Sequence, residues 1–410
     1  MKKLFSILLT LLMLALIVTP ALAAPADYPS VDPKDADAID VAAVIAAEAA
    51  AADGQITVKA PSAILMERRT GAVIYEKDAD APREPASVTK IMTLLLAIEA
   101  IESGALKLDD VITTSDRAAS MGGSQIYLKA GEQMTVRDIM RAIAVNSAND
   151  AAVAMAEQLA GSEETFAAKM NARAAELGMT NTHFTNCSGL PDDGTHVTTA
   201  RDIALMSREL MSHKSIREFT TIWTGTLRGG TFNLANTNKL IRYYNGATGL
   251  KTGFTNKAGY CLSATAERDG VEYIAVVLGA ATSPDRFEAA SSLLSYGFAN
   301  YTVVSAAPDE VIAPLKVDLG RVRVVQPVVR GAEWLLVARA DAKTLTKTVE
   351  LLPGVLAPVS EGDKLGTLTL TAGDTVLGTY DVVAAESVER LSWSDIFLAF
   401  WKLLFTIKTK

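Results

Sequence analysis

The sequence is poor in the side chains that build zinc sites and α/β-hydrolase triads. Its three histidines, His183, His196 and His213, show no metal-ligand spacing, and no His-Glu-x-x-His motif is present. Because a zinc peptidase uses paired imidazoles on one helix face, a zinc carboxypeptidase is disfavoured, and we expect neither a metal nor another cofactor. The chain also lacks Gly-x-Ser-x-Gly, the turn that exposes the nucleophile of α/β-hydrolases.

Cysteine is scarce as well, since Cys187 and Cys261 are the only two in 410 residues. They can meet only if a loop folds onto a strand, and two cysteines in an exported chain need not pair. We therefore expect free or buried thiols.

Basic residues are outnumbered by acidic ones. The 39 lysines and arginines stand against 47 aspartates and glutamates, which gives a formal charge of −8. Removing Lys2 and Lys3 with a leader peptide would take this charge to about −10, so there is no reason to expect nucleic-acid binding.

The first residues have the pattern of a secretory signal peptide. Two lysines precede an apolar run over residues 4–18, and Ala21-Leu22-Ala23 offers small residues for cleavage. The run is too short for a transmembrane anchor. We predict a signal peptide over residues 1–23, which would export the protein. A mobile linker rich in alanine, aspartate and proline would follow over residues 24–55, with a short helix through its alanines.

A serine and a lysine three positions apart are the first catalytic candidates. Ser87 precedes an apolar run over residues 91–98 that predicts a buried helix, so Lys90 should share its helix face. A lysine can take the serine proton only if burial or a second cation lowers its pKa, and Lys251 is a candidate for that cation. The free N–H groups at the helix start would stabilise the anion formed on attack.

A second string, Ser147-Ala148-Asn149, separates two helix-like runs over residues 136–145 and 151–159. A helix cap is the simpler explanation of such a polar break. The other explanation is that Ser147 is a second proton carrier for the same reaction.

A third string, Lys251-Thr252-Gly253, lies in a predicted strand. An antiparallel pair follows it, with a turn at residues 268–270 and an apolar strand over residues 273–278. Such a strand can present its backbone to an extended peptide while Lys251 and Thr252 bind a carboxylate. Gly253 leaves room for close backbone approach.

Together the three strings resemble those of penicillin-binding proteins and class A β-lactamases, with Ser-Ala-Asn in place of Ser-Asp-Asn. More specifically, the chain resembles the low-molecular-mass penicillin-binding proteins that are serine-type D-Ala-D-Ala carboxypeptidases. The resemblance extends from near Pro61 to the C-terminus. It includes residues 181–190, 199–202 and 251–260.

This resemblance implies a mechanism. Ser87 would attack the penultimate D-Ala carbonyl of a peptidoglycan stem peptide, with Lys90 as the general base. The terminal D-Ala would leave, protonated by way of Ser147 and Lys251, and water would release the shortened peptide. β-Lactam antibiotics would acylate the same serine.

The resemblance also assigns binding residues. Asn149 would hold the substrate amide, and the backbone N–H groups of Ser87 and Phe254 would form the oxyanion hole. Some family members have a histidine in place of Phe254, but the oxyanion hole needs only the backbone N–H at this position. Arg286 would meet the substrate carboxylate; the alternative is an exposed arginine beside Asp285.

The pattern of elements predicts a β-lactamase/transpeptidase-like catalytic domain over residues 56–300, of mixed α/β class. Early strands, a helical middle and late strands indicate one antiparallel sheet, closed by both ends of the domain and covered by helices. Short strands separated by glycine, proline and aspartate then predict a small β-sandwich-like domain over residues 301–386. We expect that domain to be a spacer or docking module.

The last segment, residues 387–410, predicts an amphipathic helix. Asp395 and Lys402 fall on one narrow polar stripe, and apolar side chains that include two tryptophans occupy the rest. This pattern favours a helix lying in the membrane surface, which would place the exported enzyme on the outer face of the bacterial cytoplasmic membrane. The alternative is a helix packed on the β domain. An inserted span would bury Asp395 and Lys402 in lipid at high cost.

Two other functions share part of this pattern. A β-lactamase would need Glu-x-x-Leu-Asn between Ser147 and Lys251, and none is present. A non-catalytic binder of wall peptides would have no use for a nucleophile paired with a base. Within the resembled family, an endopeptidase acting on cross-links would use the same acylation chemistry, and the sequence does not separate the two.

Overall fold

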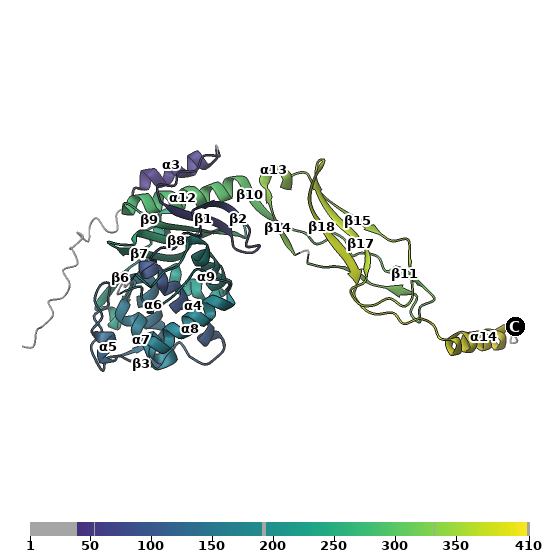
Figure 1. Ribbon diagram of the computed structural model, residues 1–410, viewed down its shortest axis with the longest axis horizontal. Helices are drawn as coiled ribbons and strands as arrows, with labels where there is room; N and C mark the ends of the chain where they lie inside the picture. The colour runs from purple at the N-terminus through teal and green to yellow at the C-terminus, as the bar shows by residue number, and fades with distance from the viewer. Residues whose placement is uncertain (1–38, 53, 191–193, 332, 408–410) are drawn as a thin grey trace, which may run out of the picture. The chain divides into compact units, whose positions relative to one another are not determined.

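The computed structural model describes residues 39–407 except 53, 191–193 and 332 (Figure 1). The predicted signal peptide and the first part of the predicted linker lie outside these residues. The predicted fold class, a mixed α/β catalytic domain followed by an all-β domain and a terminal helix, is confirmed.

One five-stranded antiparallel sheet forms the centre of the catalytic domain. Its first two strands come from the start of the domain and its last three from the end, as predicted from the sequence. The β8–β9 turn is tight because Asp269 (φ 53°) and Gly270 (φ 77°) both adopt left-handed backbone conformations. The strand order is β2 (Val73–Lys77), β1 (Ser62–Glu67), β9 (Val271–Ala280), β8 (Gly259–Arg268) and β7 (Ala247–Thr255).

Strand β9 is largely apolar because both faces of the sheet are covered, and its one charged residue, Glu272, is buried in ion pairs with Arg68 and Arg217. Ile274 and Val276 belong to the core on the face that most of the helices cover. The alternate residues Ala275 and Val277 belong to the core beneath α12 (Ser283–Asn300) on the opposite face. The main helical layer contains α4 (Lys90–Glu102), α6 (Val136–Asn146), α7 (Asn149–Ala160), α8 (Glu163–Glu176) and α9 (Ala200–Ser212).

Shorter elements complete this domain. Thr199 caps α9 by accepting a hydrogen bond from the Asp202 N–H, as its spacing predicts. The shorter elements are β3 (Val111–Thr113), α5 (Asp116–Ala119), β4 (Gln133–Thr135), η2 (Lys214–Ile216), α10 (Arg217–Thr220), β5 (Thr224–Leu227), η3 (Arg228–Gly230), β6 (Phe232–Ala235) and α11 (Leu240–Tyr243).

The structure differs from the predicted mobile linker over part of its length. Residues Val41–Ala52 form helix α3, the short alanine helix, and α3 packs against α12. Alanine is the strongest helix former, and Val44 and Ala47 are buried in the core that α12 shares. This part of the predicted linker is therefore packed onto the catalytic domain.

The all-β domain consists of short sheets around two small cores. Its four-stranded sheet has the order β13 (Pro327–Val329), β18 (Thr375–Ala384), β17 (Lys364–Ala372) and β15 (Leu345–Leu351). A three-stranded sheet has the order β12 (Val324–Val325), β11 (Leu315–Asp318) and β16 (Val355–Leu356). Strand β10 (Tyr301–Ser305) pairs with β14 (Trp334–Ala338), followed by α13 (Arg339–Ala342), and the chain ends in α14 (Trp393–Ile407).

Candidate active site

Ser87 lies in a single 3₁₀ turn, η1 (Ala86–Thr89), which leads directly into α4. Lys90 is the first residue of α4, and its Nζ lies 2.9 Å from Ser87 Oγ. The spacing of three residues therefore brings the two side chains together, as predicted.

The Lys90 amine is wholly buried and has three oxygen neighbours. Besides Ser87, its Nζ lies 2.6 Å from Asn149 Oδ1 and 2.8 Å from the Ser188 carbonyl oxygen. Burial lowers the pKa of Lys90 to about 7, although Cys187 and Asp150 act in the opposite direction. The sequence left open whether burial or a second cation lowers this pKa, and burial is the main cause.

This arrangement suits a general base. A neutral amine has two hydrogens and one lone pair. The hydrogens can go to Asn149 and Ser188, whose oxygens only accept, and this leaves the lone pair for the Ser87 hydroxyl hydrogen. The geometry thus orients the base as well as removing its charge.

Ser147 connects α6 to α7 in the left-handed conformation (φ 61°, ψ 27°) and is 4% exposed. Its Oγ has no hydrogen-bond partner among the residues that the structure describes. Ser147 is the C-cap of α6, as the helix-cap explanation allows, but its side chain does not cap α7, whose N-cap is Ala148. A hydroxyl held by left-handed backbone, with no partner among the described residues, can exchange a proton with a substrate.

Asn149 begins α7 and bridges two segments. Its Oδ1 accepts from Lys90, and its Nδ2 donates to the Gly122 carbonyl at 2.8 Å. An amide nitrogen has a second hydrogen, so the predicted contact with a substrate amide is compatible with this position and stays a prediction.

Strand β7 brings the third string against the nucleophile turn. A Cβ on Gly253 would lie 2.6 Å from the Pro85 carbonyl oxygen and 3.1 Å from the Ser87 nitrogen. On the same strand, Lys251 is buried and donates to the Thr252 carbonyl at 3.1 Å. Thr252 Oγ1 donates to Thr237 Oγ1 at 2.7 Å. All three predicted strings therefore meet at one site.

Arg286 lies on α12 and is 2% exposed, so the alternative of an exposed arginine is wrong. It donates to the Gly253 carbonyl at 3.2 Å and lies over the Tyr260 ring, 5.3 Å from its centroid. The peptide whose carbonyl it binds also carries the Phe254 N–H of the predicted oxyanion hole. The arginine therefore orients that peptide, and its contact with a substrate carboxylate stays a prediction. The Phe254 ring packs against Tyr260, with 4.3 Å between centroids.

Residues 185–190 also form part of the active site, which their residue types alone did not indicate. Ser188 supplies a carbonyl to Lys90, and Asn186 Oδ1 accepts from the Gly189 N–H at 2.6 Å. Gly189 has φ 82°, and any Cβ there would lie 1.9 Å from the Ala86 carbonyl oxygen. The sequence suggested this segment only through the family resemblance, because a main-chain carbonyl leaves no residue signature.

The two cysteines are free and buried, as predicted. Burial raises the pKa of the Cys187 thiol well above its usual value and that of Cys261 to about 11. Both are therefore protonated at neutral pH, and neither is an activated nucleophile.

Among the residues that the structure describes, Glu99, Glu209 and His213 place ligand atoms within 4.8 Å of one another. Arg173 lies 2.8 Å from the Glu99 carboxylate and 2.7 Å from that of Glu209. Because a guanidinium already occupies the place of a metal ion, this cluster is an ion-pair network.

Comparisons with known proteins agree with this geometry. A family model described as D-alanyl-D-alanine carboxypeptidase matches residues 46–282, and one described as penicillin-binding protein 5, C-terminal domain, matches residues 301–390. The chain is 41% identical over 341 residues to the D-alanyl-D-alanine carboxypeptidase DacF of Bacillus subtilis, covering 82% of this chain and 87% of the relative.

Two solved structures are also similar to the chain. One is penicillin-binding protein 5 of Haemophilus influenzae, with a TM-score of 0.74, 26% identity, and coverage of 82% of this chain and 99% of that one. The other is a penicillin-binding protein of Listeria monocytogenes in its ampicillin-bound form. Its TM-score is 0.55 and its identity 35%, with coverage of 60% of this chain and 99% of that one.

The buried lysine predicts an acid limit to acylation. Burial lowers the pKa of Lys90 to about 7, so the amine has a free lone pair above this pH and loses it below. The second-order rate constant for acylation by benzylpenicillin should be level above about pH 8 and fall about tenfold per unit below about pH 6. A pH series of rapid-mixing measurements checks this. A rate that keeps rising from pH 8 to pH 10 would mean that Lys90 titrates as an ordinary lysine.

The close approach of β7 predicts that Gly253→Ala slows acylation about 10²-fold, because the added methyl group pushes the strand away from the Ser87 turn. Gly225→Ala is the matched control, since its Cβ would meet no atom closer than 3.7 Å. Both rates are measured with benzylpenicillin. Equal rates for the two variants would show that the contact has no catalytic consequence.

Proposed function

The chain belongs to the D-alanyl-D-alanine carboxypeptidase family, and we propose that it removes the terminal D-alanine from peptidoglycan stem peptides through an acyl-enzyme on Ser87. The observation that carries this proposal is the buried Lys90 amine, 2.9 Å from the Ser87 hydroxyl and oriented by two further oxygens. A binder without catalysis has no need of this pair.

The proposed reaction uses these residues in two steps. Lys90 takes the hydroxyl proton as Ser87 attacks the penultimate D-Ala carbonyl, and the N–H groups of Ser87 and Phe254 stabilise the oxyanion. The C–N bond then breaks, and the leaving amine receives a proton by way of Ser147 and Lys251. Water hydrolyses the ester, returns a proton to the site and releases the shortened peptide.

A β-lactam would follow the first half of this path. Attack of Ser87 opens the lactam ring, but the leaving amine stays tethered to the acyl group, which slows its replacement by water. The similar penicillin-binding protein from Listeria monocytogenes, known in an ampicillin-bound form, supports this part of the proposal.

We expect Ser87→Ala to abolish both reactions, because among the described residues Ser87 supplies the one hydroxyl in hydrogen-bond contact with the Lys90 amine. The mature protein is mixed with benzylpenicillin and analysed by intact-mass spectrometry, and D-alanine release from a diacyl-Lys-D-Ala-D-Ala peptide is assayed in parallel. The unchanged chain should give a stable adduct that maps to Ser87, together with D-alanine. Rapid hydrolysis of penicillin without D-alanine would indicate a β-lactamase, and neither adduct nor product would leave only a binding role.

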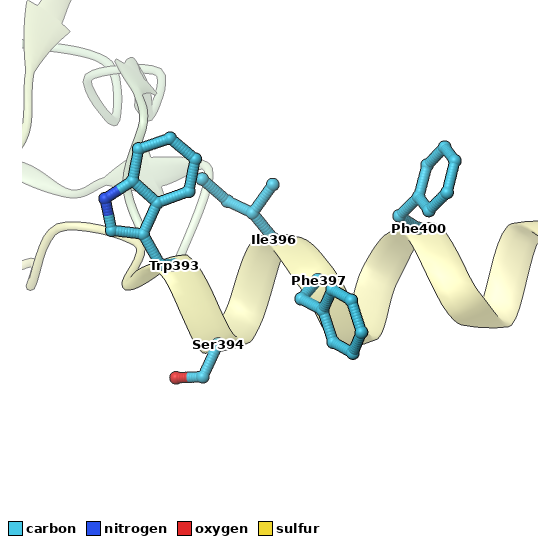
Figure 2. Close-up of a pocket in the computed structure, with 5 residues that line it drawn as sticks. All are labelled: Trp393, Ser394, Ile396, Phe397 and Phe400. Atoms are coloured by element: carbon cyan, nitrogen blue, oxygen red, sulfur yellow. The ribbon is translucent and has the colours of Figure 1, made fainter.

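We also propose that α14 holds the enzyme on a membrane surface. Its apolar side chains are largely exposed: Trp393 is 87%, Phe397 61% and Phe400 58% accessible. Figure 2 shows that Trp393, Ile396 and Phe400 project to one side of the helix, whereas Ser394 points to the other. Such a row of large apolar residues that no described residue covers is typical of a membrane-surface helix. No described helix is both long and apolar enough to span a bilayer.

Deleting residues 391–410 should release the protein from lipid vesicles without changing turnover of a soluble peptide. A sharper test adds one charge on either side of α14. Phe400→Asp should weaken vesicle binding, because it places a carboxylate in the apolar row, and Ser394→Asp should not. Co-sedimentation with anionic vesicles gives the bound fraction, and unchanged binding of the deletion variant would refute the proposed anchor.

A further inference from the structure

A buried histidine outside the three catalytic strings is connected to the nucleophile turn. Thr89 is fully buried, and its Oγ1 lies 2.8 Å from the Ala86 carbonyl oxygen and 2.7 Å from His196 Nε2. A hydroxyl has one hydrogen. Because the Ala86 carbonyl can only accept, Thr89 donates to it and must accept from His196. The hydrogen on this imidazole is therefore on Nε2.

The other imidazole nitrogen fixes the charge of the ring. His196 Nδ1 lies 3.1 Å from the backbone nitrogen of Thr185, which is an N–H group and can only donate. Nδ1 must then be unprotonated. The two contacts are satisfied together only by a neutral imidazole with its hydrogen on Nε2. His196 is 2% exposed and packs against the Phe184 ring, with 5.6 Å between centroids.

The two groups that His196 contacts belong to the segments that set the Ser87–Lys90 geometry. Through Thr89 the histidine holds the carbonyl of Ala86, whose backbone is in the left-handed region (φ 47°) directly before the nucleophile. Through Thr185 it holds the start of the segment whose Ser188 carbonyl binds the Lys90 amine. A residue with φ > 0 that is not glycine persists where its surroundings hold it in place.

We propose that His196 is a positioning residue for acylation, acting as a neutral two-sided clamp between the Ser87 turn and the segment that orients Lys90. This inference rests on the proposed function, because it concerns the geometry of the same nucleophile. His196 takes no proton from the substrate. It sets the direction of the Ala86–Ser87 peptide, and with it the Ser87 N–H and the position of Oγ.

A double-mutant cycle on the full mature chain tests this. Thr89→Val removes the hydroxyl at nearly constant shape, and His196→Phe removes both ring nitrogens. Each should lower the second-order rate of acylation by benzylpenicillin about 10²-fold, the scale expected for a small displacement of reacting atoms. The double variant should lose little more than His196→Phe alone, because replacing His196 already removes the hydrogen bond that Thr89→Val removes.

Rescue and control variants separate positioning from general damage. Thr89→Ser, which restores a hydroxyl, should recover most of the rate. Tyr244→Phe removes a buried hydrogen bond of 2.9 Å to Ser295, in the core on the other face of the sheet, and should leave acylation unchanged. With the dipeptide-terminated substrate, kcat should fall in the Thr89→Val and His196→Phe variants while KM holds, since substrate contacts stay intact.

The outcomes are distinct. Two results would overturn the proposal in an active enzyme. One is a decrease in acylation rate in the double variant that equals the product of the two single decreases. The other is a Thr89→Ser variant that is acylated as slowly as Thr89→Val. If His196→Phe does not fold, the acylation rates of Thr89→Val and Thr89→Ser still decide whether the Thr89 hydroxyl is needed for acylation. Equal rates for these two variants would overturn the proposal. Absence of any adduct in the unchanged chain would overturn the proposed function itself, and this inference with it.

Discussion

A primary amine kept away from water is the constraint on which the rest of this site depends. Burial favours the uncharged form of Lys90, but an unpaired buried amine is costly, so the protein must surround it with oxygens. Those oxygens come from Ser87, Asn149 and Ser188, which belong to three separate parts of the chain. One nitrogen atom therefore fixes three segments relative to one another: the η1 turn, the start of α7 and the segment over residues 185–190.

The sheet sets the other side of the site. Strand β7 runs so close to the Ser87 turn that only a glycine fits at position 253. From behind, Arg286 binds the carbonyl of the same glycine. Substrate would thus lie between a rigid strand and a rigid turn, with donors on both. This preorganisation matters because hydrogen-bond donors stabilise a developing charge best when they need not move.

Much of this could be predicted from the sequence where the information is local. The spacing of Ser87 and Lys90 predicts a shared helix face, and the strand–turn–strand pattern after Lys251 predicts the antiparallel pair that follows its strand. Contacts made by main-chain atoms, such as that of the Ser188 carbonyl with Lys90, could not be predicted. Every residue type has a main-chain carbonyl, so the sequence does not mark which one binds the amine. The burial of Arg286 also depends on tertiary packing, since its sequence neighbours alone suggest a solvent-exposed helix start. The packing of α3 on α12 escaped prediction for the same reason.

The topology of the sheet has a consequence for when the protein becomes reactive. Strand β1, from the start of the domain, pairs with β9, from its end, and β9 also pairs with β8. Until β9 has been synthesised, the sheet has no central strand and the helical layer has nothing to cover. The Lys90 amine then stays hydrated and protonated, and Ser87 remains an ordinary alcohol. A nascent or truncated chain would be inert toward acylating agents, so the reactivity of a single serine reports that the entire catalytic domain has folded.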